Sequence, residues 1–290
     1  MSGEIVRAWT DDNLGLQGML CRPRSPSIRL VLHVHGSYGN FYENLFLDEV
    51  AGACTSSGTA FLSVNTRGHD YYSDFKTRRP QGGYCSKRIG GILEEFGDCL
   101  LDIRAWIDLA ESTGYTCVLL QGHSLGAMKA AYYCARTHDT RVRALFLISP
   151  PDILGTVRKS PDRNLDRNLS LARELAQDNP DGLMPDGTSY DPIGAGNYLS
   201  LFSNLEIAGM FSFPGRPNSI LSSLELPVHA VVGGQDEYIT RDAEELMSLL
   251  GRSVSSARQF TGRAIRDANH VYDDREKELG SVLADWASRY

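Results

Sequence analysis

The strongest constraint on the fold is a repeated alternation of short apolar runs with longer amphipathic segments. Near-continuous apolar runs occupy residues 28–36, 59–68, 115–124, 142–150 and 228–236. Such runs are typical of strands buried on both faces, and intervening helices are the connections that parallel strands need. The pattern therefore predicts an α/β fold built on a mostly parallel, doubly wound sheet.

The rest of the core is predicted from weaker patterns. Residues 5–9 and 16–23 flank turn-forming residues, which predicts an antiparallel hairpin at a sheet edge, and residues 256–262 read as the last strand. A polar, glycine-containing stretch after residue 68 is expected to be a long loop, and such loops often line sites. Helices are expected at 42–57, from about 94, at 125–136, at 241–250 and at 273–288.

The alternation breaks between residues 151 and 224, where Pro and Gly punctuate short helical pieces. We interpret this segment as a helical lid inserted into a core formed by residues 1–150 and 225–290. Its large apolar side chains are candidates for a substrate pocket, although packing of the lid itself explains them equally well. These side chains are Tyr190, Tyr198, Phe202, Met210, Phe211 and Phe213.

The composition is that of an ordinary globular protein, with 42% hydrophobic and 22% charged residues. A net charge of -7 without a basic block argues against nucleic acid or an anionic membrane as a partner and favours a small-molecule substrate. The N-terminus lacks the pattern of a secretory signal, so we expect a cytoplasmic protein. Six cysteines without a Cys-x-x-Cys pair predict neither a zinc site nor a disulfide framework. No pattern indicates the oligomeric state.

The motif that carries chemistry is Gly-His-Ser-Leu-Gly at residues 122–126, which fits G-x-S-x-G. It lies where a predicted apolar strand meets a predicted helix, and a sharp turn there would hold the Ser124 hydroxyl out over the sheet edge. Serine is a weak nucleophile, so a neighbouring base must remove its proton. The alternative is a glycine-flanked turn in which Ser124 caps the helix.

The motif and its context resemble the α/β-hydrolase superfamily over nearly the whole chain. That resemblance implies the chain order nucleophile, acid, histidine, which here corresponds to Ser124, Asp236 and His270. Asp236 follows a strand and a glycine turn, and His270 lies before the last helix. Asp152 is the competing acid, since some members carry it after the earlier strand. His123 lies too close to Ser124 to serve as the base but is a candidate pocket residue.

The resemblance also implies an oxyanion hole after the first core strand, at His35-Gly36-Ser37-Tyr38-Gly39. Backbone N–H groups of Ser37 and Leu125 are the expected donors, with Tyr38 as the alternative in the loop and also a candidate pocket residue. His33 and His35 face the same way on one strand, but no further ligands accompany them, so we expect no metal and no cofactor. The Arg67-Gly68 turn is expected to be structural.

The resemblance implies a serine hydrolase that cleaves a carboxylic ester or related acyl compound through an acyl-enzyme on Ser124. The same residues would serve a thioesterase or acyltransferase on carrier-bound or coenzyme A-bound acyl groups, or a hydrolase of carbon–carbon bonds, because one fold hosts many chemistries. A non-catalytic ligand-binding protein of the same fold is the alternative from another class.

Overall fold

The computed structural model describes residues 2–160, 163–189, 191–213, 215 and 217–290. It is organised around an eight-stranded sheet in the order β1-β2-β4-β3-β7-β8-β9-β10. All neighbouring pairs from β4 to β10 are parallel, whereas β2 pairs antiparallel with both β1 and β4. The predicted fold class is therefore confirmed. The strands are β1 (Glu4–Trp9), β2 (Gly15–Cys21), β3 (Arg29–Val34), β4 (Ala60–Val64), β7 (Cys117–His123), β8 (Val142–Ile148), β9 (Val228–Gly233) and β10 (Phe260–Ile265).

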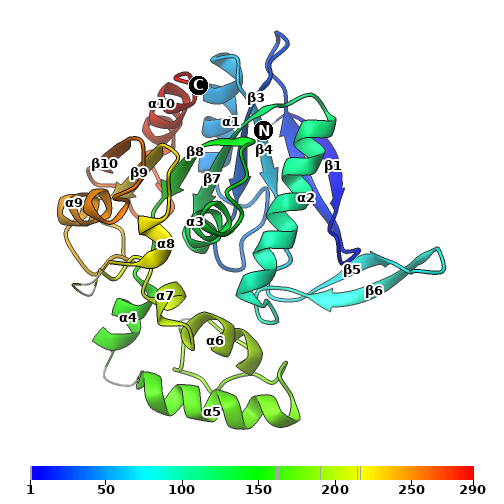
Figure 1. Ribbon diagram of the computed structural model, residues 1–290, viewed down its shortest axis with the longest axis vertical. Coiled ribbons are helices and arrows are strands. Elements are labelled where there is room, and N and C mark those ends of the chain that lie inside the picture. The colour runs from blue at the N-terminus through cyan, green and yellow to red at the C-terminus, as the bar shows by residue number, and fades with distance from the viewer. Residues whose placement is uncertain (1, 161–162, 190, 214, 216) are drawn as a thin grey trace.

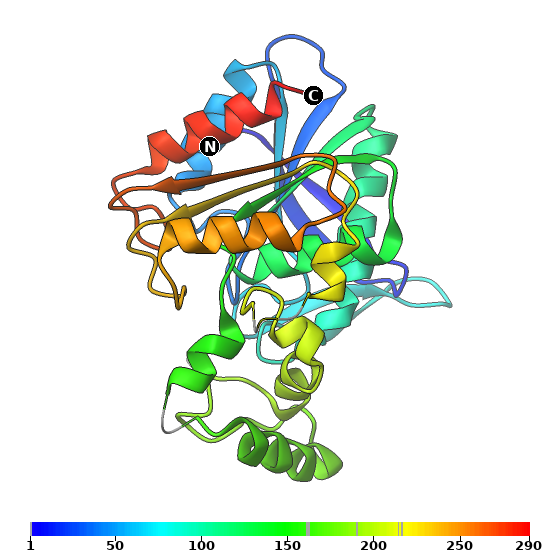
Figure 2. The same ribbon diagram turned by 60° about the vertical axis from the view of Figure 1, so that its left-hand side comes forward.

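Helices cover both faces of this sheet (Figures 1 and 2). On one face, α1 (Phe46–Ser56) packs against α10 (Glu276–Ala287). On the other lie α2 (Cys99–Ser112), preceded by the 3-10 turn η1 (Phe96–Asp98), α3 (Leu125–Thr137) and α9 (Ala243–Ser253). None of the described helices is both long and apolar enough to cross a lipid bilayer.

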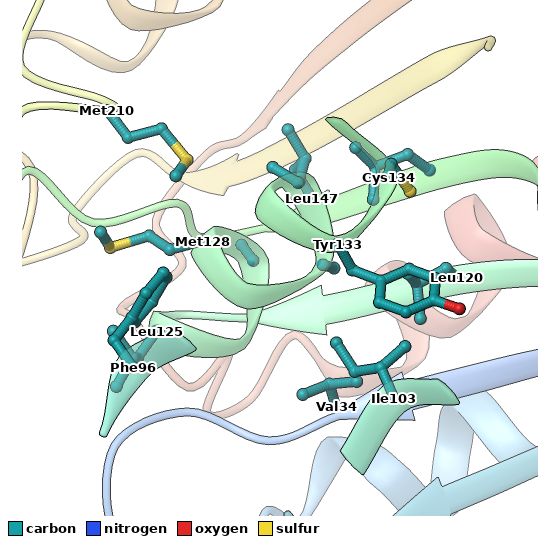
Figure 3. Close-up of a cluster of buried hydrophobic side chains, with 14 of the residues drawn as sticks. Val34, Phe96, Ile103, Leu120, Leu125, Met128, Tyr133, Cys134, Leu147 and Met210 are labelled. Carbon is teal, nitrogen blue, oxygen red and sulfur yellow. The ribbon is translucent and has the colours of Figure 1, made fainter. Parts of the chain in front are cut away.

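Side chains alternate between the two faces along each central strand and so build two separate cores. In β3, Leu30 and Leu32 belong to the core beneath α2 and α3, whereas Val31 belongs to the core beneath α1 and α10. Figure 3 shows part of the first core, where Leu120 from the sheet lies beside Tyr133 of α3, and Met128 points from the same helix toward the side of Met210 and Phe96. Because both faces are covered, the strands are apolar throughout, which is why they are easy to recognise in the sequence.

The stretch after residue 68 contains a second, two-stranded antiparallel sheet, where the sequence led us to expect a loop. Its strands are β5 (Ser73–Arg78) and β6 (Tyr84–Ile89), and the hairpin projects away from the body of the molecule (Figure 1). We call it the β5–β6 arm. Most of its side chains are polar and exposed, so it lacks the apolar alternation that marks a strand packed on a core.

Among the described residues between β8 and β9, in the segment predicted to be an insertion, the helices are α4 (Ile153–Lys159), α5 (Leu165–Asp178), α6 (Ala195–Phe202), α7 (Leu205–Ala208) and α8 (Ser219–Ser222). We call residues 151–224 the insert. In both views α4 to α7 form a group beyond one end of the sheet, whereas α8 packs on α3 (Figures 1 and 2).

Candidate active site

Ser124 occupies a strained turn between β7 and α3. Its φ is +55° and its ψ is -126°, a conformation that L-residues rarely adopt. The turn is possible only because the residues two positions before and two positions after Ser124 are glycines. A Cβ on Gly122 would lie 2.1 Å from the carbonyl oxygen of Gly126, and one on Gly126 would lie 2.3 Å from that of Val34. The two glycines therefore let the helix start directly against β3 while the serine stays half-exposed at the strand end.

His270 and Asp236 form a buried hydrogen-bonded pair. His270 Nδ1 lies 2.8 Å from Asp236 Oδ1 and 3.0 Å from Oδ2, and each residue is only 5% exposed. Burial raises the pKa of Asp236, but hydrogen bonds from His270, the Tyr238 backbone N–H and Ser149, with the nearby imidazole charge, outweigh it and leave this pKa lowered. The carboxylate is therefore ionised at neutral pH, and it accepts a hydrogen bond from Nδ1, so Nε2 remains available for a partner.

Ser124 and His270 line the same cavity, which has a volume of about 350 Å³ and lies between the sheet edge and the insert. Within the described part of the chain, the Ser124 hydroxyl makes no hydrogen bond to the imidazole. Catalytic hydrogen bonds are often long before substrate binds. The fold thus brings the three residues predicted from the sequence to one rim of the sheet, two of them in direct contact and the third across a shared cavity.

The loop after β3 approaches the nucleophile closely. A Cβ on Gly36 would lie 2.9 Å from Ser124 Cβ and 3.4 Å from Ser124 Oγ, so only glycine fits there. Ser37 and Tyr38 follow Gly36, and both line the cavity together with Leu125. Leu125 is the first residue of α3, so its N–H has no carbonyl partner within the helix and can bind an anion.

His35 and His123 each make hydrogen bonds to backbone groups next to the site. His35 Nε2 accepts the N–H of Thr66 at 3.0 Å, so Nδ1 carries the proton and donates to the Gly36 carbonyl at 2.7 Å. His123 Nε2 donates to the carbonyl of His270 at 2.9 Å, and burial lowers the pKa of His123 to about 3. His33 contacts Gln121 instead. Each imidazole thus has its own protein partner.

Charged residues behind the nucleophile form two buried networks. Lys129, on α3, is 0% exposed, and its Nζ lies 2.7 Å from Oε1 and 2.9 Å from Oε2 of Glu94, which lines the cavity. Burial raises the pKa of Glu94 although Lys129 opposes the shift. Arg67 binds Asp102, Asp98 and Asp12, so it ties the turn after β4 to α2 and to the β1–β2 turn, as expected for a structural arginine.

The candidate pocket residues divide into two groups. Tyr38, His123 and Phe202 line the cavity, whereas Tyr198 and Phe211 do not and are buried in the core, at 0% and 1% exposure. Both side chains are therefore buried in packing, which is the alternative left open by the sequence. Tyr190 lies outside the described residues. Other lining residues carried no motif and were not singled out from the sequence: Glu43, Tyr71, Glu94, Asp191, Asn197 and Tyr238.

Asp152, the competing acid, has other partners in the structure. Its carboxylate caps α4 by accepting the N–H of Gly155 at 2.8 Å, and it also accepts the hydroxyls of Ser212 and Thr240. The His270 imidazole contacts Asp236 instead. Asp152 therefore links the start of the insert, a residue near its end, and the loop that follows Asp236.

Comparisons with known proteins agree with this architecture. The alpha/beta hydrolase fold family matches residues 29–182. Est1E from Butyrivibrio proteoclasticus with bound ferulic acid has a TM-score of 0.65 at 17% identity, covering 97% of each chain. The esterase domain of a Rhodothermus marinus protein has a TM-score of 0.64 at 18% identity, covering 100% of this chain and 99% of that one.

A monoacylglycerol lipase from Paleococcus ferrophilus has a TM-score of 0.61 at 18% identity, over 100% of this chain and 99% of that one. No curated protein matches the chain. At these identities the structural likeness shows the fold, whereas the family match spans more than half of the sequence and includes Ser124. The chain is therefore a member of the alpha/beta hydrolase fold family.

Proposed function

We propose that this protein is a serine hydrolase that cleaves a carboxylic ester or related acyl compound through an acyl-enzyme on Ser124. The observation that carries the proposal is the buried Asp236–His270 pair facing the same cavity as a serine in a strained strand-to-helix turn. Structural neighbours named as esterases and a lipase support an ester as the substrate.

The chemistry follows from the groups present. His270 Nε2 takes the proton of Ser124 as Oγ attacks the acyl carbon, and the ionised Asp236 stabilises the resulting imidazolium. Backbone N–H groups of Ser37 and Leu125 bind the oxyanion. The carbon–oxygen bond of the ester then breaks, the alcohol leaves with the proton from His270, and water releases the acid by the same steps in reverse order.

The insert acts as the lid in this proposal. Ile153, Val157, Ile193, Leu201 and Phe202 contribute apolar side chains to the cavity from the insert, opposite the sheet edge that carries Ser124. A cavity of about 350 Å³ bounded in this way suits a small acyl compound, and covering it excludes water from the charged intermediates.

A fluorophosphonate probe tests the nucleophile, because it reacts only with an activated serine. The wild type should be labelled and Ser124→Ala should not be, and equal labelling of the two would refute the assignment. Asp236→Asn should lower kcat for a p-nitrophenyl ester by about three to four orders of magnitude with little change in folding. Asp152→Asn is the matched control and should retain activity.

A further inference from the structure

The β5–β6 arm is basic, in contrast to the rest of the molecule. Residues 73–89 contain five Lys and Arg side chains and one Asp, a net charge of +4. Since the whole chain carries -7, all other residues together carry -11. The five basic residues are all exposed: Lys76, Arg78, Arg79, Lys87 and Arg88.

Strand pairing is what gathers this charge. In the sequence the basic residues form two short groups separated by a glycine turn, so no basic block is evident. Antiparallel pairing places Phe75 opposite Lys87 and Lys76 opposite Ser86, so the two groups share one small sheet. Arg88 pairs with Asp74, and Arg78 lies over the Trp9 ring, but Lys76, Arg79 and Lys87 form no ion pair in the described part of the chain.

The base of the arm forms part of the cavity wall. Tyr71, just before β5, and Gly91, just after β6, both line the cavity that holds Ser124. The Tyr71 ring stacks on Tyr38 with centroids 4.7 Å apart, and Tyr38 donates a hydrogen bond to the Pro192 carbonyl of the insert at 2.8 Å. The base of the arm therefore borders the cavity that holds Ser124, whereas its tip projects away from the body (Figure 1).

The positive charges of the arm are spread over its surface and are not gathered in a pocket. Lys76 and Lys87 point to opposite faces of the hairpin, because successive side chains alternate and these two occupy positions of different parity. Arg79 lies in the turn at the tip. At about 3.4 Å per residue, Lys87 is about 14 Å along the chain from Gly91. A small anion would need a concave site, whereas a broad acidic surface is attracted by charges spread in this way.

We infer that the β5–β6 arm docks an acidic carrier protein, which delivers its acyl group as a thioester to Ser124. The inference rests on the proposed function and narrows its substrate class. The rest of the chain, with its net charge of -11, repels such a carrier overall, whereas the arm attracts it, and an acyl group on a long flexible tether spans the distance from the arm to the cavity. Ser124 Oγ bonds to the thioester carbon, the carbon–sulfur bond breaks, and the thiol leaves with the proton from His270; water then releases the acid.

The test compares one acyl group in two forms. An octanoyl thioester on an acidic acyl carrier protein is measured beside octanoyl-N-acetylcysteamine, which has the same reacting bond and no protein. The variant is Lys76→Glu/Arg79→Glu/Lys87→Glu, with Arg104→Glu/Arg143→Glu/Arg258→Glu as control, since these three arginines are also exposed and the change in net charge is identical.

The arm variant should lose at least about tenfold in kcat/KM on the carrier substrate at low salt, and much less at high salt, because steering is screened. Its kcat/KM on the small thioester should stay within twofold of wild type, which also shows that it is folded. The control variant should retain most of its activity on both substrates.

Equal losses in the two variants, or no loss on the carrier substrate, would overturn the inference. Salt-sensitive dimers of the wild type that the arm variant abolishes, with carrier kinetics unchanged, would identify a second copy of this chain as the occupant instead. Arm-dependent binding of an oligonucleotide with unchanged carrier kinetics would identify a nucleic acid. If Ser124→Ala retains activity on the small thioester, the proposed function itself has failed; if only the arm effect is missing, that function stands.

Discussion

Lys129→Met should destabilise the protein strongly, because it leaves the Glu94 carboxylate buried without its counter-ion. Lys129 is 0% exposed and Glu94 is 5% exposed, and the ammonium lies within 3 Å of both carboxylate oxygens. Removing one partner of such a pair costs about 3–5 kcal/mol at neutral pH. Urea unfolding followed by circular dichroism measures the loss, and Lys277→Met, which alters an exposed lysine, should stay within about 0.5 kcal/mol of wild type.

The pH dependence of the stability of Lys129→Met tests the same reasoning more specifically. Burial already raises the pKa of Glu94, and removing Lys129 removes the charge that opposes this shift. Folded Lys129→Met therefore holds a proton on Glu94 that the unfolded chain releases above a pH of about 4.3. Its free energy of unfolding should consequently increase as pH falls from 7, by up to about 1.4 kcal/mol per pH unit, until the unfolded chain is protonated as well.

The double variant Glu94→Met/Lys129→Met decides whether the buried charge is the cause. It removes both ions and fills similar space with apolar chains, so it should lie within about 1 kcal/mol of wild type or be more stable. A coupling free energy of at least about 3 kcal/mol in the double-mutant cycle would support the reasoning. If the double variant is as unstable as the sum of the two single ones, packing rather than charge is responsible and the reasoning is refuted.

Three further predictions concern the glycines of two helices, the Asp139 carboxylate and the cavity wall. Gly126→Ala places a Cβ 2.3 Å from a backbone oxygen, so it should destabilise the protein by at least about 1–3 kcal/mol and reduce activity. In Gly52→Ala, in α1, the added Cβ meets nothing within 4 Å, so thermal unfolding should show a stabilisation of about 0.5–1 kcal/mol. Asp139→Asn should destabilise the protein at pH 5–7, and this difference should disappear as the pH falls below about 4. Burial raises the pKa of Asp139, but hydrogen bonds from Arg141 and Tyr133 outweigh this effect and hold the pKa below its value in the unfolded chain. A difference in stability that does not depend on pH would contradict this. Phe202→Ala should raise KM for p-nitrophenyl esters of longer acyl chains more than for acetate, and equal effects would remove Phe202 from the acyl pocket.

The parts of the fold that were predictable are those whose signal is local. Strands buried on both faces are apolar throughout, and the Ser124 turn is encoded in five consecutive residues. The β5–β6 arm was missed because an exposed hairpin carries no apolar alternation. The last strand was predicted to begin at residue 256, but it begins at Phe260. Residues 254–259 instead connect α9 to this strand, and pairing with β9 sets where the strand starts.

The site shows the same division between local and long-range information. Ser124 is identified by its motif. Asp236 and His270 are identified because their order and positions in the chain match the pattern of the family that the sequence resembles. Glu94 and Lys129 are separated by 35 residues and follow no motif, so only the folded chain shows that they pair behind the nucleophile. The burial of Tyr198 and Phe211 likewise depends on which side of the insert is covered, which helix periodicity alone does not determine.

The Asp152 carboxylate has a consequence for how this chain can diverge. It holds Ile153–Lys159 at the first turn, Ser212 late in the same excursion, and Thr240 on the main body. One carboxylate thus ties both ends of this excursion to the main body, in addition to the contacts that α8 and Pro192 make with it. Exposed residues between these anchors can therefore vary in sequence and number, changing which molecules reach Ser124 while the sheet beneath stays intact.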